Sequence, residues 1–229
     1  MNLLALDTST ELCSVALWRA GEIVERAEWV GNRHSEVLLP MARGLMAECG
    51  MQLSDLDGLA CGIGPGSFTG LRIGCGVAQG LAFAADIPVL GVVTLEAMAL
   101  DLARRSGVAN VLACIDARMN EVYAAAYRVE VGPPLEIVPP CVLPPARLCL
   151  PPGGGWVGGG TGFSAYGEIL RQGLGGLLAG VEADVHPRAG VLLDLARPRF
   201  EAGEGGPAET LEPFYVRDKV ALTVAERKP

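Results

Sequence analysis

Lysine is nearly missing from this chain, which carries only Lys219 and Lys228 among its 229 residues. This scarcity excludes a Walker lysine, a Schiff-base lysine and a serine–lysine catalytic pair anywhere before Lys219. Basic residues are also outnumbered, with 18 Lys and Arg against 26 Asp and Glu and a net charge of -8. Because non-specific nucleic-acid affinity comes mainly from clustered basic side chains, this charge argues against a broad phosphate-binding surface.

Histidines and paired cysteines are scarce as well. His34 and His186 are the only histidines, and the seven cysteines include no C-x-x-C pair. The cysteines are odd in number and lie mostly in apolar runs, which is typical of reduced thiols in a core.

The chain also lacks a long uninterrupted apolar run. Its most apolar stretch, at 77–100, is broken by Gln79, Asp86, Pro88 and Glu96, and no basic region precedes the N-terminal apolar stretch. We therefore expect no signal peptide, no membrane span and a cytoplasmic location. With 50% hydrophobic residues, the chain can bury a substantial core, arranged in two small lobes that share one interface.

The most specific pattern present is the glycine-rich segment from Cys61 to Gly74, CGIGPGSFTGLRIG. It lies between a strand-like and a helix-like run, so it predicts a strand, a glycine turn and a helix start. Glycine turns of this kind let backbone N–H groups approach an anion or a neighbouring chain. Three known motifs do not fit. The Walker loop lacks its lysine, the dinucleotide fingerprint lacks its third glycine, and the hydrolase elbow has Pro65 and Thr69 where glycines belong.

Hydrophobic periodicity predicts an order of elements that repeats. The first half reads as strands at 3–6, 12–17, 22–30, 59–63 and 88–93 and helices at 35–50, 71–85 and 95–105, the first of them capped by Ser35. Strands at 111–115 and 121–129 then restart the pattern around a second polar turn, which indicates an internal duplication. The remainder is less regular: a proline-rich stretch at 133–152, a glycine cluster at 153–162, helices at 163–171 and 189–196, and a mobile linker at 201–213.

The glycine-rich segment resembles that of a specific family when it is read with other parts of the chain. GPGSFTGLRIG, together with LALDTSTELCSVAL, NRHSEVLLPM, IDARMNEVYAA and PFYVRDKVALT, is similar to the TsaB family, also called YeaZ. The resemblance implies an α/β fold of the actin-like ATPase type, in which a ribonuclease-H-like lobe is duplicated. We divide the two lobes near residue 106, into an N-terminal lobe at 1–106 and a degenerate C-terminal lobe with a mobile tail at 107–229.

The same resemblance implies a function in tRNA modification. It predicts a non-catalytic scaffold subunit that pairs with TsaD as a heterodimer, joins the ATPase TsaE in a ternary complex and forms a homodimer when alone. The complex would install threonylcarbamoyl on the adenosine beside the anticodon of tRNAs that read codons beginning with A. The chain would contact tRNA only through the complex, and it would not bind a membrane.

A nucleotide site is the first candidate for chemistry within the chain. Asp7, Thr8 and Ser9 form a polar turn where ATPases of this architecture place a phosphate-facing hairpin, and Asp116 occupies the matching turn of the second half. Gly159, in VGGGTG, stands where this fold class usually meets an adenosine. Carboxylates and hydroxyls can hold Mg²⁺ and phosphate, but Asp and Thr more often close turns through their own hydrogen bonds. We favour the turn role and expect no cofactor beyond weak ATP or ADP binding.

The resemblance also singles out residues 94–98. TsaB resembles its partner TsaD, which holds a metal through an H-x-E-x-H type motif after the corresponding strand. Here Thr94 and Met98 occupy the two histidine positions, and only Glu96 remains. Because neither Thr nor Met suits a hard catalytic cation, we expect no metal site and no catalytic residue.

The predicted helix at 71–85 favours a protein partner. After Arg72 its only strongly polar side chain is Gln79, and the other residues are apolar or small. A helix that is apolar on all sides must be covered on all sides, and small residues let another backbone approach closely. Burial inside the protein's own core would explain the same pattern. Read with the resemblance, the sequence predicts a partner interface that comprises Leu38, Met41, Leu45, Arg72, Ile73, Gly76, Val77 and Gly80.

Two other functions remain open from the sequence. The chain could be an ATP-binding enzyme that uses Asp7, Asp116 and Gly159, or a peptidase built on His34 and an unidentified nucleophile. The peptidase has little support, because nothing in the spacing of the histidines places a nucleophile beside them.

Overall fold

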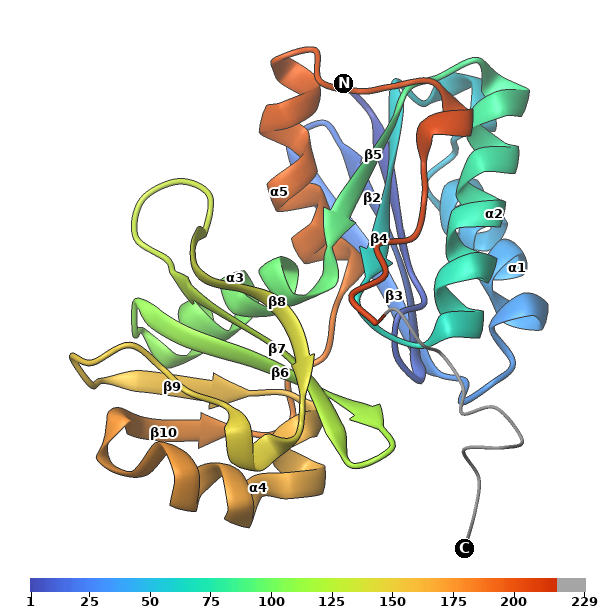
Figure 1. Ribbon diagram of the computed structural model, residues 1–229. Helices are drawn as coiled ribbons and strands as arrows, with labels where there is room; N and C mark the ends of the chain where they lie inside the picture. The colour runs from blue at the N-terminus through green and yellow to red at the C-terminus, as the bar shows by residue number, and fades with distance from the viewer. Residues whose placement is uncertain (218–229) are drawn as a thin grey trace, which may run out of the picture.

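The computed structural model describes residues 1–217, in which strands and helices alternate as an α/β protein (Figure 1). The first group of strands is β1 (Leu3–Asp7), β2 (Leu12–Arg19), β3 (Glu22–Trp29), β4 (Gly58–Gly64) and β5 (Val89–Val93). The second group is β6 (Asn110–Arg118), β7 (Glu121–Arg128), β8 (Leu135–Leu143), β9 (Trp156–Gly159) and β10 (Leu178–Glu182). The helices are α1 (His34–Glu48), α2 (Phe68–Ala85), α3 (Thr94–Ser106), α4 (Thr161–Leu174) and α5 (Ala189–Glu201).

The two groups of strands form two five-stranded sheets with the same topology. Their orders are β3-β2-β1-β4-β5 and β8-β7-β6-β9-β10. In each sheet the first three strands are antiparallel, and the last two run parallel to the central strand, β1 or β6. Because the order repeats strand for strand, the prediction of a duplicated ribonuclease-H-like fold of the actin-like type, with two lobes, is confirmed.

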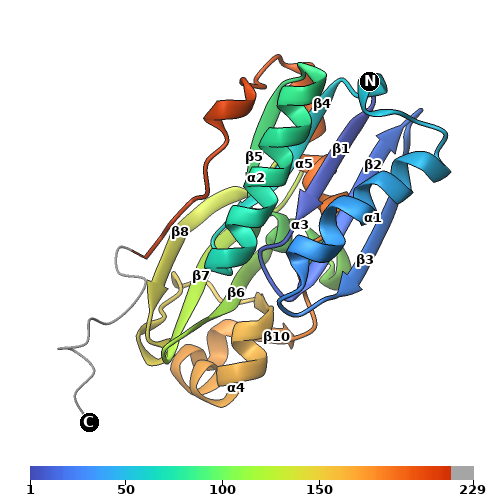
Figure 2. The same cartoon turned by 90° about the vertical axis from the view of Figure 1, so that its right-hand side faces the viewer.

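Helices cover both faces of each sheet. Figure 2 shows α1 and α2 side by side on one face of the first sheet, while α5 lies on the other face. Every residue of β1 is buried, as expected for a central strand covered on both faces. In the second lobe α4 covers one face and α3 the other.

The division of the chain near residue 106 separates the sheets but not the helices. The helix α3 belongs to the first half, yet Leu95, Met98 and Leu102 pack in a core with β6 and β9 of the second sheet. In return α5 belongs to the second half and buries Leu192 and Leu193 against β1, β2 and β4. The prediction that 107–229 forms a lobe of its own is therefore wrong for α5, because the apolar face of this helix is buried on the first sheet.

Two helix starts differ from the prediction. The helix α1 begins at His34 after Arg33, with no side-chain cap, so the prediction of a Ser35 cap is wrong. The helix α2 begins at Phe68, three positions earlier than expected. Its cap is Ser67, whose hydroxyl accepts a hydrogen bond from the Gly70 N–H at 3.2 Å.

The second half contains three strands that periodicity did not predict, β8, β9 and β10. The strand β8 lies in the proline-rich stretch and includes Pro139 and Pro140. These prolines are tolerated because β8 is an edge strand, where a residue without an N–H loses no ladder hydrogen bond. The strand β9 lies in the glycine cluster and has only four residues, which are too few to show a periodic pattern.

The segment after α5 is not the linker that the sequence predicted. Gly206 pairs with Val89 in an isolated bridge, Ala208 and Leu211 are buried, and the Gln79 side chain donates a hydrogen bond to the Leu211 carbonyl at 2.9 Å. These contacts attach it to β5 and α2. The predicted mobile tail at 218–229 lies outside the described residues.

Two further sequence expectations concern the thiols and the membrane. All seven cysteines are free; Cys13, Cys61, Cys75 and Cys114 are buried, as expected of core thiols, whereas Cys149 is exposed. None of the helices in the described range combines the length and the hydrophobicity needed to traverse a bilayer.

Candidate functional site

A cleft of about 1010 Å³ lies between the two lobes. Its walls come from the β1–β2 turn, the first turns of α1, α2 and α4, and the β6–β7 hairpin. Of the residues predicted to hold a nucleotide, Ser9 and Asp116 line the cleft. Asp7, Thr8 and Gly159 are buried elsewhere, so the structure corrects their assignment to this site.

Asp7 and Thr8 are used inside the first lobe. One oxygen of the Asp7 carboxylate, Oδ1, accepts hydrogen bonds from the Ser9 N–H at 3.0 Å and the Ser9 hydroxyl at 2.7 Å. The Thr8 hydroxyl donates to the Gly70 carbonyl at 2.8 Å, and both Asp7 and Thr8 are 0% exposed. These bonds close the β1–β2 turn and fix it to α2, which is the turn role that the sequence favoured.

The environment of Asp7 disfavours its charge. Burial raises its pKa from 3.8 to about 6, although the two hydrogen bonds from Ser9 act in the opposite direction. Its second oxygen, Oδ2, has no hydrogen-bond partner among the described residues and faces Gly62, where a Cβ would lie 1.9 Å from it. A carboxylate enclosed in this way cannot reach a phosphate or a metal ion in the cleft.

We expect the substitution Asp7→Asn to flatten the dependence of stability on pH. Between about pH 3.8 and pH 6 the folded protein keeps a proton on Asp7 that the unfolded chain has lost, so the free energy of unfolding falls as the pH rises through this window. The drop amounts to about 3 kcal/mol, and Asn removes it while preserving an oxygen for Ser9. Urea unfolding across this window measures it.

The matched control for this substitution is Glu22→Gln, which neutralises an exposed carboxylate on β3. Glu96 and Asp101 also have raised pKa values because of burial, and they titrate in all three proteins alike. Equal pH dependence of Asp7→Asn and the unchanged protein would contradict the assignment of the window to Asp7.

The glycines of the glycine-rich segment let it contact the β1–β2 turn directly. A Cβ at Gly66 would lie 2.3 Å from the Ser9 carbonyl oxygen, and one at Gly70 would lie 2.0 Å from the Thr8 carbonyl oxygen. At Gly74 it would lie 2.4 Å from the Thr8 hydroxyl. These three glycines therefore allow the backbone of the glycine-rich segment to contact the β1–β2 turn. The segment packs against another part of its own chain.

The β6–β7 hairpin carries an arginine that bridges the two lobes. Arg118 forms ion pairs with Asp116 at 3.1 Å in its own lobe and with Glu11 at 2.7 Å across the cleft. Asp116 also accepts hydrogen bonds from the Arg118 N–H at 2.9 Å and from the Tyr166 hydroxyl at 3.3 Å. With these donors on its oxygens, Asp116 is a structural anion, and a cation there would have to displace Arg118.

Gly159 serves packing in the second lobe. A Cβ at this position would lie 2.9 Å from the side chain of Leu102 and 3.0 Å from the Glu182 carbonyl oxygen. The short strand β9 thus needs glycine here so that α3 can approach the sheet. This role replaces the predicted contact with an adenosine.

The two residues at the positions of the TsaD histidines, Thr94 and Met98, have structural roles. The Thr94 hydroxyl accepts a hydrogen bond from the Gly64 N–H at 3.0 Å, and Met98 lies in the core of the second lobe. Burial raises the pKa of Glu96, which lies between them in sequence. In the described range, no three His, Cys, Asp or Glu side chains are grouped closely enough to hold a metal ion.

His34 lies at the start of α1 and lines the cleft, with 4% of its surface exposed. Burial lowers its pKa below 6.5, while a hydrogen bond with the Thr10 backbone and the charge of Glu11 act in the opposite direction. No serine or cysteine side chain in residues 1–217 is hydrogen-bonded to His34 or His186; the latter contacts Asp184. The peptidase alternative therefore gains no support from the geometry.

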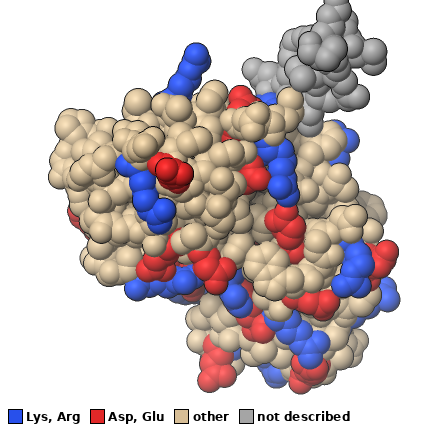
Figure 3. Space-filling model, turned by 90° about the horizontal axis from the view of Figure 1, so that it is seen from below, with Lys and Arg blue, Asp and Glu red and all other residues tan. Residues whose placement is uncertain are grey.

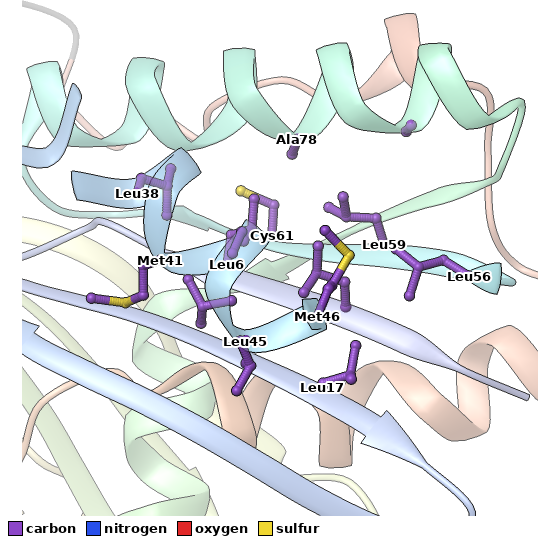
Figure 4. Close-up of a cluster of buried hydrophobic side chains, with 14 of the residues drawn as sticks. Leu6, Leu17, Leu38, Met41, Leu45, Met46, Leu56, Leu59, Cys61 and Ala78 are labelled. Atoms are coloured by element: carbon purple, nitrogen blue, oxygen red, sulfur yellow. The ribbon is translucent and has the colours of Figure 1, made fainter. Parts of the chain in front are cut away.

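The predicted partner residues on α1 point into the protein. Leu38, Met41 and Leu45 are at most 9% exposed and pack with Leu6 and Leu17 in the first core (Figure 4). They cannot form a partner surface without unfolding the lobe, so this part of the predicted interface is wrong.

The predicted residues on α2 fall into two groups. Arg72, Gly76 and Gly80 are exposed, and Ile73 and Val77 are half-buried against the first core. The neighbouring residue Ala78 faces the core in Figure 4 and is 0% exposed. Thus α2 is not buried on all sides, since one of its faces is open.

The open face of α2 also includes Phe83, whose side chain is 81% exposed. Arg72, Gly76, Gly80 and Phe83 follow at spacings of four, four and three residues along one side of the helix. We call these four residues the α2 face. The helix-wide apolar pattern of the sequence did not distinguish them from the buried positions, because most residues on both sides of α2 are apolar or small.

A C-terminal strap at 213–217 lies beside this face and was not predicted as part of a site. The Phe214 N–H donates to the Ile63 carbonyl at 2.8 Å, and the Tyr215 hydroxyl accepts from Arg72 Nε at 3.0 Å. At the end of the strap Arg217 pairs with Glu121 of the second lobe at 2.5 Å. The strap therefore joins the α2 face to the β6–β7 hairpin.

The charge on one face of the molecule does not suggest a nucleic-acid site. On the face seen in Figure 3, Lys and Arg side chains are interspersed with Asp and Glu rather than gathered by sign. Basic and acidic side chains also pair with one another, as Arg104 does with Asp194. This pattern agrees with the negative net charge, which is expected to repel phosphate backbones.

Known proteins resemble this chain in both sequence and fold. A family model described as TsaD, tRNA N6-adenosine threonylcarbamoyltransferase, matches residues 27–159. YeaZ from Pseudomonas aeruginosa has a TM-score of 0.86 with 43% identity over 93% of this chain and 99% of that one. A second crystal structure, described as an uncharacterized protein with similarity to peptidase YEAZ from the same organism, has a TM-score of 0.87 with 43% identity over 94% and 99%. The chain is thus a two-lobed protein of the YeaZ structural class.

Relatives in other bacteria define the family more narrowly. The protein named tRNA threonylcarbamoyladenosine biosynthesis protein TsaB from Escherichia coli is 40% identical over 227 residues, covering 96% of each chain. Its namesake from Haemophilus influenzae is 39% identical over 96% of this chain and 95% of that one. The chain belongs to the TsaB family.

Proposed function

We propose that this chain is a non-catalytic accessory subunit in the synthesis of threonylcarbamoyladenosine in tRNA, and that it acts by pairing with TsaD. The names of its relatives support the pathway. The α2 face is the surface that we assign to TsaD and, in the absence of TsaD, to a second copy of the chain. TsaE would join the pair in a ternary complex, tRNA would be reached only through that complex, and the location would be cytoplasmic.

The observation that carries this proposal is the pair of exposed glycines on α2. A Cβ at Gly76 or Gly80 would meet nothing within 4 Å, in contrast to Gly70 and Gly74, where it would collide with Thr8. Glycine in a helix interior costs about 1 kcal/mol relative to alanine, and no atom of residues 1–217 requires it at these two positions. A second backbone that approaches the helix closely would require it, because any side chain would hold that backbone away.

Phe83 supports the same surface. An aromatic ring that is 81% exposed at the end of the glycine stripe is unfavourable in water and is typical of an anchor in a protein interface. Arg72, at the other end, is stacked over Phe68 at 3.8 Å and held by Tyr215, so it is ordered before any partner arrives. The α2 face thus combines two glycines that let a partner backbone come close with two large side chains, Arg72 and Phe83, that can hold the partner.

The contacts of Asp7 and Asp116 support the absence of catalysis. Asp7 is enclosed, Asp116 is held by Arg118 and Tyr166, and the chain has no lysine before Lys219 that could bind the transferred phosphate. These features leave no carboxylate free to hold Mg²⁺ at the positions used by the ATP-binding alternative.

We expect the isolated protein to hydrolyse ATP no faster than a buffer control in the presence of Mg²⁺. Release of phosphate from the purified chain measures this, and Asp116→Asn serves as the matched variant. A clear ATPase rate that disappears in Asp116→Asn would show that the chain is an enzyme in its own right and would refute the accessory role.

A further inference from the structure

Arg72 on the α2 face is held in one orientation but has no carboxylate partner within residues 1–217. Its guanidinium carbon lies 3.8 Å from the centre of the Phe68 ring, and its Nε atom donates a hydrogen bond to the Tyr215 hydroxyl at 3.0 Å. Both Nη atoms belong to an exposed residue and have no acceptor in the described range. A guanidinium ordered in this way can bind a carboxylate with little further loss of side-chain entropy.

A carboxylate without a partner lies at the other end of the same helix. Asp86 is the exposed C-cap residue of α2, and its side chain forms no ion pair or hydrogen bond within residues 1–217. The C-terminal end of a helix carries partial negative charge, so a carboxylate is unfavourable there. The left-handed backbone of Asp86, with a φ of 53°, is also one that helix ends more often give to glycine. The charges of Arg72 and Asp86 therefore add to the dipole of α2 instead of opposing it.

An antiparallel copy of α2 would bring these two groups together. The two exposed glycines of the α2 face are centred on position 78, so a helix that crosses there in the opposite direction places its Ala84 opposite Arg72. Ala84 is exposed and small, which leaves room for the arginine. At 1.5 Å per residue, Arg72 lies about 9 Å from the crossing point, whereas Phe83 and Asp86 lie about 7.5 Å and about 12 Å from it on the other side. Both are thus within reach of the arginine side chain.

A parallel copy would have the opposite effect. It would place Arg72 beside Arg72 and Asp86 beside Asp86, and like charges at these distances repel one another. It would also align the two helix dipoles side by side in the same direction, which is unfavourable. Charge complementarity therefore selects the antiparallel arrangement of two copies.

We propose that a second copy of this chain docks on the α2 face with its α2 antiparallel, and that Arg72 of each copy pairs with Asp86 of the other. The contact occurs twice in such a symmetric dimer, and the Phe83 ring beside each ion pair shields it from water. Tyr215 is a positioning residue, because it acts by holding Arg72. This inference rests on the assignment of the α2 face to pairing, and it adds the orientation of the two copies and the charged contact that fixes it.

Charge reversal tests the contact in the full chain. Arg72→Glu and Asp86→Arg each place like charges at both contacts, so each variant alone should self-associate at least about tenfold more weakly in sedimentation equilibrium. An equimolar mixture of the two variants restores opposite charges at both contacts, as does the double variant, and both should associate at least about threefold more tightly than either single variant. Arg171→Glu is the matched control, since it reverses an exposed arginine on α4 and should leave association unchanged. Thermal melting confirms that each variant is folded.

The positioning role of Tyr215 has a separate readout. Tyr215→Phe removes the hydroxyl that accepts from Arg72 but keeps a ring next to Phe68, 5.6 Å away between centroids. It should weaken self-association about fivefold in the unchanged protein. In an Arg72→Gln background the same substitution should have no effect, because a structural role of the ring would persist there and a role through Arg72 would not.

Two results would overturn the antiparallel contact. One is equal self-association of the unchanged protein and the two reversed variants, and the other is a mixture that associates no better than its components. Gly76→Arg distinguishes this failure from that of the proposed function, because it blocks the α2 face in any orientation. If Gly76→Arg abolished self-association while the charge reversals did not change it, the α2 face would still be the interface, but Arg72 and Asp86 would not meet across it.

Discussion

Gly76→Arg is expected to abolish pairing with TsaD while the chain itself stays folded. A Cβ at position 76 meets no atom of residues 1–217 within 4 Å and the position is exposed, so the free energy of unfolding should change by less than about 1 kcal/mol. In the complex the same arginine would be forced between two backbones, and burying an unpaired charge costs about 3–5 kcal/mol. Pairing should therefore weaken by at least about a hundredfold.

Ala78→Arg is the matched control, because it introduces the same side chain two positions away on the same helix. Ala78 is 0% exposed and faces the first core, so this variant should unfold rather than lose pairing alone. Thermal melting and size-exclusion chromatography, followed by mixing with TsaD, separate the two outcomes. If Gly76→Arg melted like the unchanged protein and still paired, the α2 face would not be the interface.

Gly70→Ala is expected to destabilise the chain strongly, whereas Gly80→Ala should stabilise it. The added methyl at position 70 would lie 2.0 Å from the Thr8 carbonyl oxygen, a backbone atom that is part of the β1–β2 turn. Overpacking of this kind costs about 1–3 kcal/mol, with more expected here because the turn is also bonded to Gly70. At position 80 the methyl meets no atom of residues 1–217 within 4 Å, and the better helix propensity of alanine adds up to about 1 kcal/mol.

Urea midpoints of the two variants test this contrast, since the substitution and the helix are the same. Opposite signs would support two different reasons for glycine on α2, one internal and one for a partner. Equal stability of Gly70→Ala and Gly80→Ala would contradict the close contact between α2 and the β1–β2 turn.

Much of the fold could be predicted because the strong signals are local. The polar turns at Asp7 and Asp116 each follow a buried apolar run, and their repetition is visible in the amino-acid sequence and indicates the duplication. The edge strand β8 was not predicted because its prolines are unusual in strands. The strand β9 was not predicted because its four residues are too few to show a periodic pattern. The exchange of α3 and α5 between the sheets is a tertiary arrangement that no local pattern encodes.

The candidate site was harder to predict, because the type of a residue does not reveal whether its side chain faces the core or the solvent. Leu38 on α1 is apolar and Gly76 on α2 is small, and the sequence assigned both to one interface, yet the first packs in the core and the second is exposed. Likewise Asp7 and Asp116 occupy equivalent turns, but one is enclosed and the other lines the cleft. The strap residue Arg217 reaches Glu121 from 96 positions away, a pairing that only the folded chain shows.

The most direct test of the accessory role is the rate at which TsaD and TsaE, supplied with tRNA, ATP and a threonylcarbamoyl donor, form threonylcarbamoyladenosine with and without this chain. We predict product only when the chain is present, none from the chain without TsaD, and none when Gly76→Arg replaces it. Product formed by the chain without TsaD, or an unchanged rate when the chain is left out, would contradict the account.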